Sequence, residues 1–378
     1  MAEKIVSPGV FTKEIDASFL PAAVGEIGAG IVGPTVKGPA MIPTVVESYS
    51  EFQSIFGDVV KSGSNSFQYL TSVTAHNYLQ HSGRLTVVRV CDDTPLRASA
   101  TVPVGQGNYH TGSTTAGENH GTTAFTINTL AHGAILNNSS SIAQTDNILL
   151  SGSKDNLRWE ISSLNQSKGT FTLLIRKGND TFKSPQILET WNNLSLDPNQ
   201  SNYISKMIGD QYPDINNDDP NDPFITYNGQ YTNKSKYVYI SDVGNTIDFL
   251  DENGDVRLSD STGSLPGLGS GSFDGSFSGG SDGYTGFDSL GNPQGAARSR
   301  HVRFYGDISA ADSQGYVLST TTAADGGSAY TEALTLLSNA DEYDINMILI
   351  PGIIDNLENG HHGIITKAID VCESRGDC

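Results

Sequence analysis

The sequence predicts a multidomain fold that mixes α/β and α+β architecture. Apolar runs with helical patterns beside them lie near both ends of the chain, which indicates one α/β body assembled from N- and C-terminal segments. The middle of the chain is rich in Thr, Ser, Asn and Gly and holds short alternating runs, which is typical of β-strands joined by turns. With 378 residues, the chain is long enough for two or three domains. We therefore expect the body to carry an inserted mixed domain and a β-rich domain.

Residues 1–20 are predicted to form an extended N-terminal arm. The turn at Pro8-Gly9 is followed by loose alternation. A terminal segment with so few apolar residues is commonly frayed, and the alternative is an arm that adds a strand to the sheet edge of a neighbouring subunit. This second interpretation makes one stretch the candidate inter-subunit site: Val10, Phe11, Thr12, Lys13, Glu14 and Ile15.

Residues 21–96, together with residues 341–378, are predicted to form the α/β body. Its first buried strand is expected within residues 28–35, where the apolar stretch GAGIVGPT is bounded by glycines. The β-branched run LTVVRV at residues 85–90 predicts a second strand.

Two helices are predicted between these strands. Ser48 and Glu51 have the spacing of a capping box, and Gly57 marks the end of the helix that follows. The second helix is expected to begin near Ser66 and to turn four apolar side chains towards the core, namely Phe67, Leu70, Val73 and Tyr78.

The C-terminal part of the body begins with a near-continuous apolar run at residues 345–352 (INMILIPG), as in strands that are buried in a parallel sheet. A helix is predicted from near Gly363, with one apolar face formed by Ile364, Ile365, Ala368 and Cys372. A crossover to another parallel strand is expected after this helix, but the sequence ends at Cys378. We therefore expect the natural protein to continue beyond this point.

Residues 97–190 are predicted to form the inserted β-rich domain. Strand candidates lie at residues 123–128, 157–162 and 170–177. The last two alternate with period two and are separated by a polar loop, so they are predicted to form a hairpin.

Residues 191–340 are predicted to form an inserted mixed α/β domain with a Gly/Ser-rich loop. It is expected to open with a loop leading into a helix, and to continue through an Asp/Asn/Pro-rich loop at residues 213–223. Strand candidates follow at residues 236–240, 298–305 and 314–320, and a helix candidate lies at residues 329–340.

The composition argues against several classes of function. The net charge is −20, and no run of basic residues is present, so the surface would repel phosphate groups and anionic lipids. No stretch of 18 apolar residues predicts a membrane span, and the N-terminus lacks the apolar region of a signal peptide. The odd set of Cys91, Cys372 and Cys378 predicts free thiols in a reducing compartment.

Four sequence patterns were weighed as chemical sites. The glycines Gly267, Gly269 and Gly271 lack the Lys-Ser/Thr of a phosphate-binding loop. His361 and His362 are adjacent, so they lack the spacing of metal ligands on a helix and are expected in the turn before one. Cys372 and Cys378 have no matching Cys or His pair for zinc, and no nucleophile elbow is present in a strand–helix context.

The fourth pattern is an acidic loop that begins like a calcium-binding loop. Its Asp/Asn alternation is right, but Asp219 and Ile225 occupy the positions of the required Gly and Glu, so a solvated acidic loop is the default interpretation and a calcium site the alternative. The side chains concerned are Asp214, Asn216, Asp218, Asp219 and Asp222. The sequence thus predicts neither an enzyme nor a bound cofactor or metal.

Five stretches resemble contractile tail sheath proteins of bacteriophages, and they occur in the order typical of that family. They are Ser7-Pro8-Gly9-Val10 with Glu14; Gly33-Pro34-Thr35 with Lys37-Gly38-Pro39 and Phe52…Phe56-Gly57; Leu85–Val90; Phe277-Ser278-Gly279-Gly280-Ser281-Asp282-Gly283; and Ile350-Pro351-Gly352 with Cys372-Glu373-Ser374-Arg375. Residues 97–190 show little resemblance, which fits a variable outward domain.

The resemblance implies a structural subunit that forms stacked six-fold rings around a tail tube and contracts to drive the tube through the host envelope. It places the α/β body inside, the inserted domains outside and the arm of residues 1–20 on a neighbouring subunit. The implied partners are further copies of the chain, the tail tube protein, and the baseplate and tail terminator proteins, without direct nucleic-acid binding or membrane insertion. The implied location is the virion tail, after synthesis in the host cytoplasm.

Three other functions remain open from the sequence. The nearest is the sheath of a related contractile device, a tailocin or a type VI secretion system. The second is a carbohydrate-binding or adhesive β-protein, which the Thr/Ser/Asn/Gly-rich middle would fit. The third is a nucleotide-dependent enzyme, which the missing Lys-Ser/Thr argues against.

Overall fold

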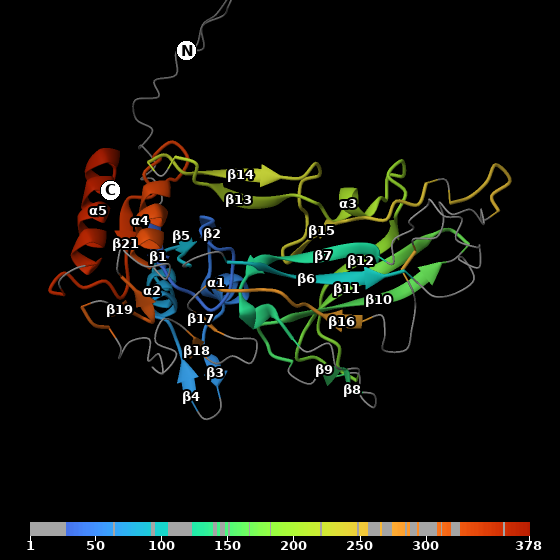
Figure 1. The fold of residues 1–378 in the computed structure, drawn as a ribbon, viewed down its shortest axis with the longest axis horizontal. Coiled ribbons are helices and arrows are strands. Elements are labelled where there is room, and N and C mark those ends of the chain that lie inside the picture. The colour runs from blue at the N-terminus through green and yellow to red at the C-terminus, as the bar shows by residue number, and fades with distance from the viewer. Residues whose placement is uncertain are drawn as a thin grey trace, which may run out of the picture.

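The structure is a computed structural model, shown in Figure 1. It describes residues 28–62, 65–91, 95–104, 123–138, 142–143, 148–149, 152–165, 167–181, 183–219, 221–247, 249–255, 265–266, 274–283, 286–287, 293–294, 308–310, 312–318, 326–357 and 360–378. The molecule is elongated, with an α/β part at one end and a part built mainly of strands at the other (Figure 1). The predicted arm of residues 1–20, with Val10–Ile15, lies outside the described residues, as do Gly267, Gly269, Gly271 and the strand candidate at 298–305.

The α/β part is built on a four-stranded sheet in the order β2-β5-β1-β21. The strands are β1 (Ala29–Gly33), β2 (Thr44–Val46), β5 (Leu85–Arg89) and β21 (Met347–Leu349). Strand β1 is parallel to both β5 and β21, with Ala29 opposite Leu85 on one side and Met347 on the other. Segments more than 300 residues apart in the sequence are therefore neighbours in one sheet.

Helices cover both faces of this sheet. Helices α1 (Tyr49–Phe56) and α2 (Leu70–Leu79) pack on the face that includes Ile31 and Val87. Helices α4 (Gly326–Leu336) and α5 (Gly360–Arg375) pack on the opposite face with Val32 and Val88. Because both faces are covered, every residue of β1 and β5 is buried, which explains their continuous apolar runs.

The Ser48 half of the capping box predicted at the start of α1 is confirmed, whereas Glu51 reaches the residue before the N-cap. The Ser48 hydroxyl accepts a hydrogen bond from the Glu51 backbone N–H at 3.3 Å, and the Glu51 carboxylate accepts one from the Glu47 N–H at 3.0 Å. Gly57 ends the helix at φ 75°, a conformation that favours glycine.

One boundary and two burial patterns in this part differ from the predictions. Helix α2 begins at Leu70, because residues 65–67 form strand β4 (Asn65–Phe67), which pairs with β3 (Val60–Ser62). Strand β21 lies at the sheet edge, where Met347 is 43% exposed, so it is only partly buried. On α5 the buried positions are His361, Ile364, Ala368 and Val371, while Ile365 and Cys372 are half-buried.

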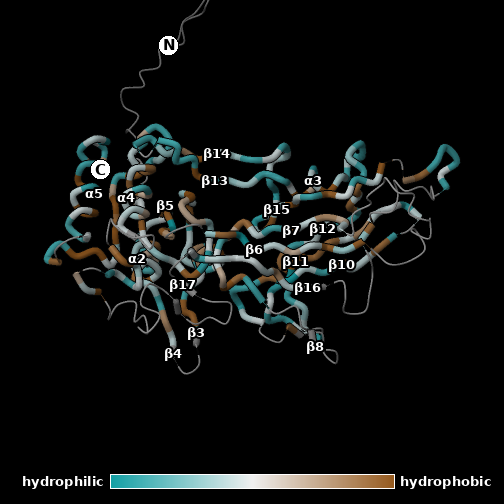
Figure 2. The backbone as a smooth tube through the Cα atoms, in the orientation of Figure 1, coloured by the Kyte–Doolittle hydropathy of each residue, from teal (hydrophilic) through white to brown (hydrophobic). Residues whose placement is uncertain are grey.

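The spacing of the buried residues explains the packing of α5. Its buried residues recur at intervals of three and four, as expected for a helix that packs along one stripe. In Figure 2 the tube of α5 carries teal, hydrophilic stretches along its length, as expected for a helix with an exposed side.

The strand-rich part contains two larger sheets around one apolar core. The first has the order β12-β11-β10-β16, with β10 (Leu157–Asn165), β11 (Thr170–Lys177), β12 (Ile187–Ser195) and β16 (Asp274–Ser276). The second has the order β15-β7-β6, with β6 (Arg97–Pro103), β7 (Thr123–His132) and β15 (Val238–Ser241). Buried side chains from both sheets, such as Phe125 and Phe171, stack in a shared core.

The predicted hairpin between residues 157–162 and 170–177 is confirmed, because β10 and β11 are antiparallel neighbours. The loop expected after residue 191 is wrong in part. Residues 187–195 form β12, and the following helix α3 (Ile204–Met207) is a single turn. Exposure along β12 does not alternate with period two, so the alternating signal that marks a half-buried strand is missing from this stretch of sequence.

A two-stranded hairpin projects from this part towards the α/β part. It consists of β13 (Tyr212–Asn216) and β14 (Phe224–Asn228), and Ile215 packs against the apolar cluster that contains α4 and α5. The predicted loop at residues 213–223 is thus shorter, since its first four residues are strand.

The remaining elements are short. They are η1 (Ala134–Leu136), β8 (Ile142–Ala143), β9 (Ile148–Leu149), β17 (Gly286–Phe287), β18 (Pro293–Gln294), β19 (Asp312–Ser313) and β20 (Tyr316–Val317). The helix predicted at residues 329–340 begins three residues earlier. No helix in the described part of the chain is long and apolar enough to cross a membrane.

Candidate functional site: a buried junction between the two parts

An ion pair at the junction joins the α/β part to the strand-rich part. Arg89, the last residue of β5, donates a hydrogen bond to the carboxylate of Asp282. The two side chains are 1% and 0% exposed. A buried charge is costly unless it is paired and hydrogen-bonded, so this pair constrains how the two parts meet.

The other contacts of Arg89 extend the junction. Its guanidinium donates to the backbone carbonyls of Gly38 at 2.9 Å and His132 at 2.7 Å. The second carboxylate oxygen of Asp282 accepts from the Ala134 backbone N–H at 3.3 Å. One arginine thus connects three chain segments that are far apart in the sequence.

His132 contributes to the same junction as a neutral acceptor. Its Nδ1 accepts a hydrogen bond from the Ala40 backbone N–H at 3.0 Å, and its own backbone N–H donates to Gly38 O at 2.9 Å. Burial, together with the charges of Arg97 and Arg89, lowers the pKa of His132 well below its usual value. The imidazole therefore stays neutral at pH 7 and can accept this bond.

Gln314 forms a second clamp inside the α/β part. Its side-chain carbonyl accepts from the Leu70 N–H at the start of α2 at 2.8 Å, and its amide donates to Pro351 O at 3.0 Å. The neighbouring Ser313 hydroxyl donates to Gly352 O at 2.7 Å. Gln314 is fully buried with φ 54°, so the clamp holds it in a conformation that costs energy.

Arg375 forms a third clamp at the end of α5. Its guanidinium donates to the carbonyls of Leu337 at 2.7 Å, Tyr343 at 2.8 Å and Ile345 at 3.2 Å. These carbonyls follow α4 and precede β21, so the arginine fixes α4, α5 and the connection between them as one unit.

The junction and the clamps of Gln314 and Arg375 contain residues from four of the stretches on which the sequence resemblance rests. Gly38, Arg89 and Asp282 meet at the junction, Pro351 and Gly352 meet Gln314, and Arg375 closes α5. These residues were not predicted from the sequence to form a network. The sequence does contain an arginine at the end of an apolar strand and an aspartate in a glycine-rich stretch. Neither pattern indicates which residue the side chain contacts.

The other candidate residues lie apart. His361 is in the first turn of α5, not before the helix, and its ring is fully buried between Ser309 O at 2.8 Å and the Ile354 N–H at 3.3 Å. His362 is exposed beside Asp355. The structure describes Cys91, Cys372 and Cys378, and none of these three residues forms a disulfide.

The acidic loop is split between a strand and a turn. Asp214 and Asn216 lie on β13, whereas Asp218 and Asp219 lie in the turn that follows. Asn216 and Asp219 accept hydrogen bonds from nearby backbone N–H groups, at 3.1 Å and 3.0 Å. Within the described residues, no group of three or more His, Cys, Asp or Glu side chains is placed to hold a metal ion.

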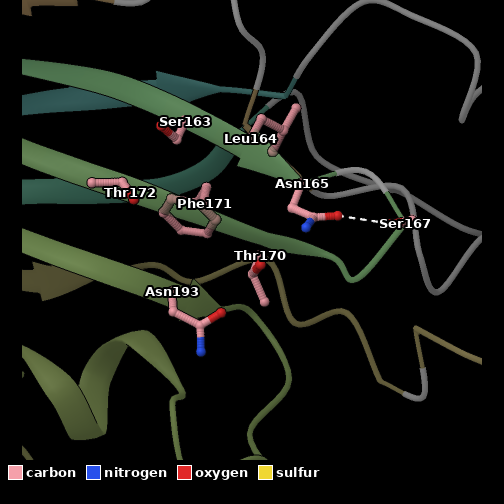
Figure 3. A pocket seen from close by; sticks show the side chains of 8 residues that line it. All are labelled: Ser163, Leu164, Asn165, Ser167, Thr170, Phe171, Thr172 and Asn193. Atoms are coloured by element: carbon pink, nitrogen blue, oxygen red, sulfur yellow. Dashed lines mark hydrogen bonds between the residues drawn. The ribbon is translucent and has the colours of Figure 1, made fainter.

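Described residues line two hollows on the surface. The larger is a cleft of about 910 Å³ whose walls come from α1, from the end of β7 and the start of β10, and from the base of the β13–β14 hairpin. The smaller, of about 620 Å³, lies at the end of the β10–β11–β12 sheet (Figure 3). Its lining is Ser163, Leu164, Asn165, Ser167, Thr170, Phe171, Thr172 and Asn193.

Comparison with known proteins points to one class. Over 113 residues, which are 28% of this chain and 16% of the relative, the sequence is 33% identical to the tail sheath protein of Vibrio phage KVP40. No family model matches the chain. Over this stretch, the chain is therefore similar to a phage tail sheath protein.

Two solved structures were also found. A sheath tail protein from Listeria innocua aligns with 92% of this chain at 9% identity and a TM-score of 0.41, and one from Desulfitobacterium hafniense aligns with 97% at 11% identity and a TM-score of 0.30. The alignments cover 44% and 62% of those two proteins. The chain thus spans less than two thirds of the length of these two proteins and of the phage relative.

Proposed function

We propose that this chain is a structural subunit of a contractile phage tail sheath, which polymerises as stacked six-fold rings around a tail tube and drives the tube through the host envelope. The observation that carries the proposal is the junction of Gly38, Arg89 and Asp282. The residues that resemble the sheath family meet there in space, although they are up to 244 residues apart in the sequence (from Gly38 to Asp282).

A contracting lattice needs subunits that move without deforming. Close-packed interiors have low compressibility, so they transmit strain and do not bend continuously. The buried Arg89–Asp282 pair and the Arg375 clamp resist hinge motion between the elements that they join. We infer that each subunit moves mainly as a rigid body and that the change of packing occurs between subunits.

We assign the contact between neighbouring subunits to the N-terminal arm. Residues Val10–Ile15 would add a strand to a sheet edge of the next subunit, through backbone hydrogen bonds that tolerate rigid-body motion. In the described part of the chain, β21 pairs with β1 alone, so its other edge offers such a template. The sequence does not distinguish a phage sheath from the sheath of a tailocin or a type VI secretion system.

The energy for contraction would be stored when the sheath assembles. Contraction then requires a metastable packing and a second packing of lower free energy, and no nucleotide is consumed. The tail tube, baseplate and tail terminator proteins are the partners expected from this role.

Electron microscopy of the purified chain at high concentration tests the proposal. We expect tubes or stacked six-fold rings, and we expect deletion of residues 1–20 to abolish them while the chain stays folded by circular dichroism. Monodisperse monomers with and without added tail tube would count against a sheath.

A second candidate function is carbohydrate binding by the strand-rich part, and the smaller hollow favours it. Its lining is neutral, with hydroxyl and amide groups suited to sugar hydroxyls (Figure 3). Asn193 lies there at φ 56°, where the register between β11 and β12 shifts. A glycan array probed with the whole chain and with the variant Asn193→Ala tests it. Binding to no glycan would remove this candidate.

A further inference from the structure

We propose that the larger cleft is a docking site for a second copy of this chain, and that its occupant is the acidic turn at the end of the β13–β14 hairpin. We call the turn residues Asp218, Asp219 and Asp222 the acidic tip. This inference rests on the proposed assembly of the chain and names one of its contacts.

The cleft is cationic in a strongly acidic protein. Four lysines line it, namely Lys37, Lys154, Lys177 and Lys236, although the chain has a net charge of −20. Burial lowers the pKa of Lys37; Asp155 opposes this shift, and the nearby charges of Lys154 and Lys177 add to it. At least three of the lysines are therefore close enough to repel one another.

The acidic side chains that line the cleft already form an ion pair or accept hydrogen bonds. Asp155 pairs with Lys37 at 3.7 Å. Asp58 accepts hydrogen bonds from Gln53 at 2.9 Å and Gln68 at 2.6 Å. Glu51 accepts from the Glu47 backbone N–H before α1.

The positive charges of three lysines in the cleft, in contrast, are not neutralised by an ion pair with a described residue. Within the described residues, Lys154, Lys177 and Lys236 form no salt bridge, and Lys154 and Lys236 are exposed. The cleft therefore presents unneutralised positive charge and fits an anionic occupant.

The walls also carry apolar surface. Pro39, Ile42, Ile55, Leu130, Leu157 and Leu188 contribute to the lining. An occupant that brings both carboxylates and some apolar surface fits this lining better than a free inorganic anion does.

The acidic tip has these properties. Asp218, Asp219 and Asp222 are exposed, and none forms a salt bridge with a described residue. The turn is ordered by its own hydrogen bonds, from Asp222 N–H to Asp219 O at 3.0 Å and from Asp218 N–H to the Asn216 side chain at 3.1 Å. Phe224, beside the turn, is 50% exposed and supplies the apolar surface.

The tip cannot occupy the cleft of its own chain. Tyr227 and Pro213, paired at the base of the hairpin, line that cleft. The strands then run away from it for three more residues, roughly 10 Å at the usual rise per residue, before the turn begins. The contact must therefore join two copies. A tip-to-cleft contact is heterologous, so it propagates into rings or helical arrays, as a sheath requires.

Charge reversal tests the contact. The cleft variant is K154E/K177E/K236E, the tip variant is D218K/D219K/D222K, and the swapped variant carries all six changes and keeps the net charge of −20. The matched control K61E/K168E/K183E reverses three exposed lysines outside the cleft. Assembly is followed by sedimentation over a range of protein concentrations, with circular dichroism to verify folding.

We expect the cleft and tip variants each to raise the critical concentration for assembly by at least about tenfold, on the scale of a few exposed ion pairs lost and replaced by repulsion. A mixture of the two variants, and the swapped variant, should assemble like the natural chain, whereas the control should shift the concentration by less than about threefold. Assembly of the cleft and tip variants at the natural concentration would overturn the inference and leave the sheath proposal standing.

Cross-linking gives a second measurement that does not need ordered tubes. Carbodiimide treatment of a mixture of ¹⁵N-labelled and unlabelled chains should give mixed-isotope peptides that join the cleft lysines to the acidic tip. Absence of such peptides at high concentration would overturn the tip–cleft contact, even if tubes form. Absence of any tube or ring in the natural chain would instead refute the proposed function.

Discussion

The Arg89–Asp282 pair offers the sharpest test of how the two parts are held together. We consider Asp282→Asn, which keeps the shape of the side chain and an oxygen for the Ala134 N–H. It removes the charge and replaces the oxygen that accepts from Arg89 with an amide NH2 group. Arg89 would keep its contacts to Gly38 O and His132 O but would lose its counter-charge in a site where both side chains are at most 1% exposed.

The expected magnitude follows from this burial. Breaking a buried pair by removing one partner costs about 3–5 kcal/mol, because the remaining charge is uncompensated. The chain also contains a matched surface pair, Arg84 and Asp344, joined at 3.1 Å with side chains 34% and 78% exposed. Removing that charge with Asp344→Asn should cost less than about 1 kcal/mol.

Chemical denaturation followed by tryptophan fluorescence and circular dichroism measures both variants. Because the chain has two parts, the transitions of the two probes must be compared before a free energy is assigned. The double variant Arg89→Met/Asp282→Leu removes both charges and should recover much of the stability lost by Asp282→Asn. If Asp282→Asn proved no more destabilising than Asp344→Asn, the pair would not be the buried constraint described above.

Three further predictions concern pH, a glycine and salt. Burial lowers the pKa of His132, so as the pH falls below about 6.5 this histidine is protonated in the unfolded chain before it is protonated in the folded one. The free energy of unfolding should therefore decrease there by up to about 1.4 kcal/mol per pH unit. In urea titrations from pH 7 to 5, the variant His132→Asn should show a smaller decrease than the natural chain. Gly352 has φ 91°, and an added Cβ would lie 2.4 Å from the Gln314 amide nitrogen, so Gly352→Ala should lower the free energy of unfolding by about 2 kcal/mol or more. Gly279 has φ 84° but open space around it, so Gly279→Ala should lower the same free energy by about 1 kcal/mol in the same denaturation assay. If surface charge sets the barrier to contraction, the contraction rate of assembled sheaths, followed by light scattering, should rise with salt; equal rates in 0.05 M and 0.5 M NaCl would exclude that role.

Much of the local structure could be predicted because it depends on short-range patterns. The N-cap at Ser48, the end of α1 at Gly57 and the β10–β11 hairpin all follow from the chemistry of neighbouring residues. The predictions failed where tertiary contacts compete with such patterns. The apolar run that contains Phe67 was expected in a helix, but Phe67 pairs with Val60 in a short hairpin. Cys372 was expected on the buried face of α5, but Val371 lies against α4 instead.

The sequence by itself determined the class of each segment and the acidic charge, because hydrophobic periodicity and composition are properties of the chain alone. It also determined the resemblance to sheath proteins through stretches that lie far apart. Only the tertiary structure decided that Gly38, Arg89 and Asp282 meet, that β21 lies beside β1, and that lysines from separate segments line one cleft. The physical reason is that a buried charge or a strand edge selects its partner by position in space, and no pattern within a short window of sequence records that position.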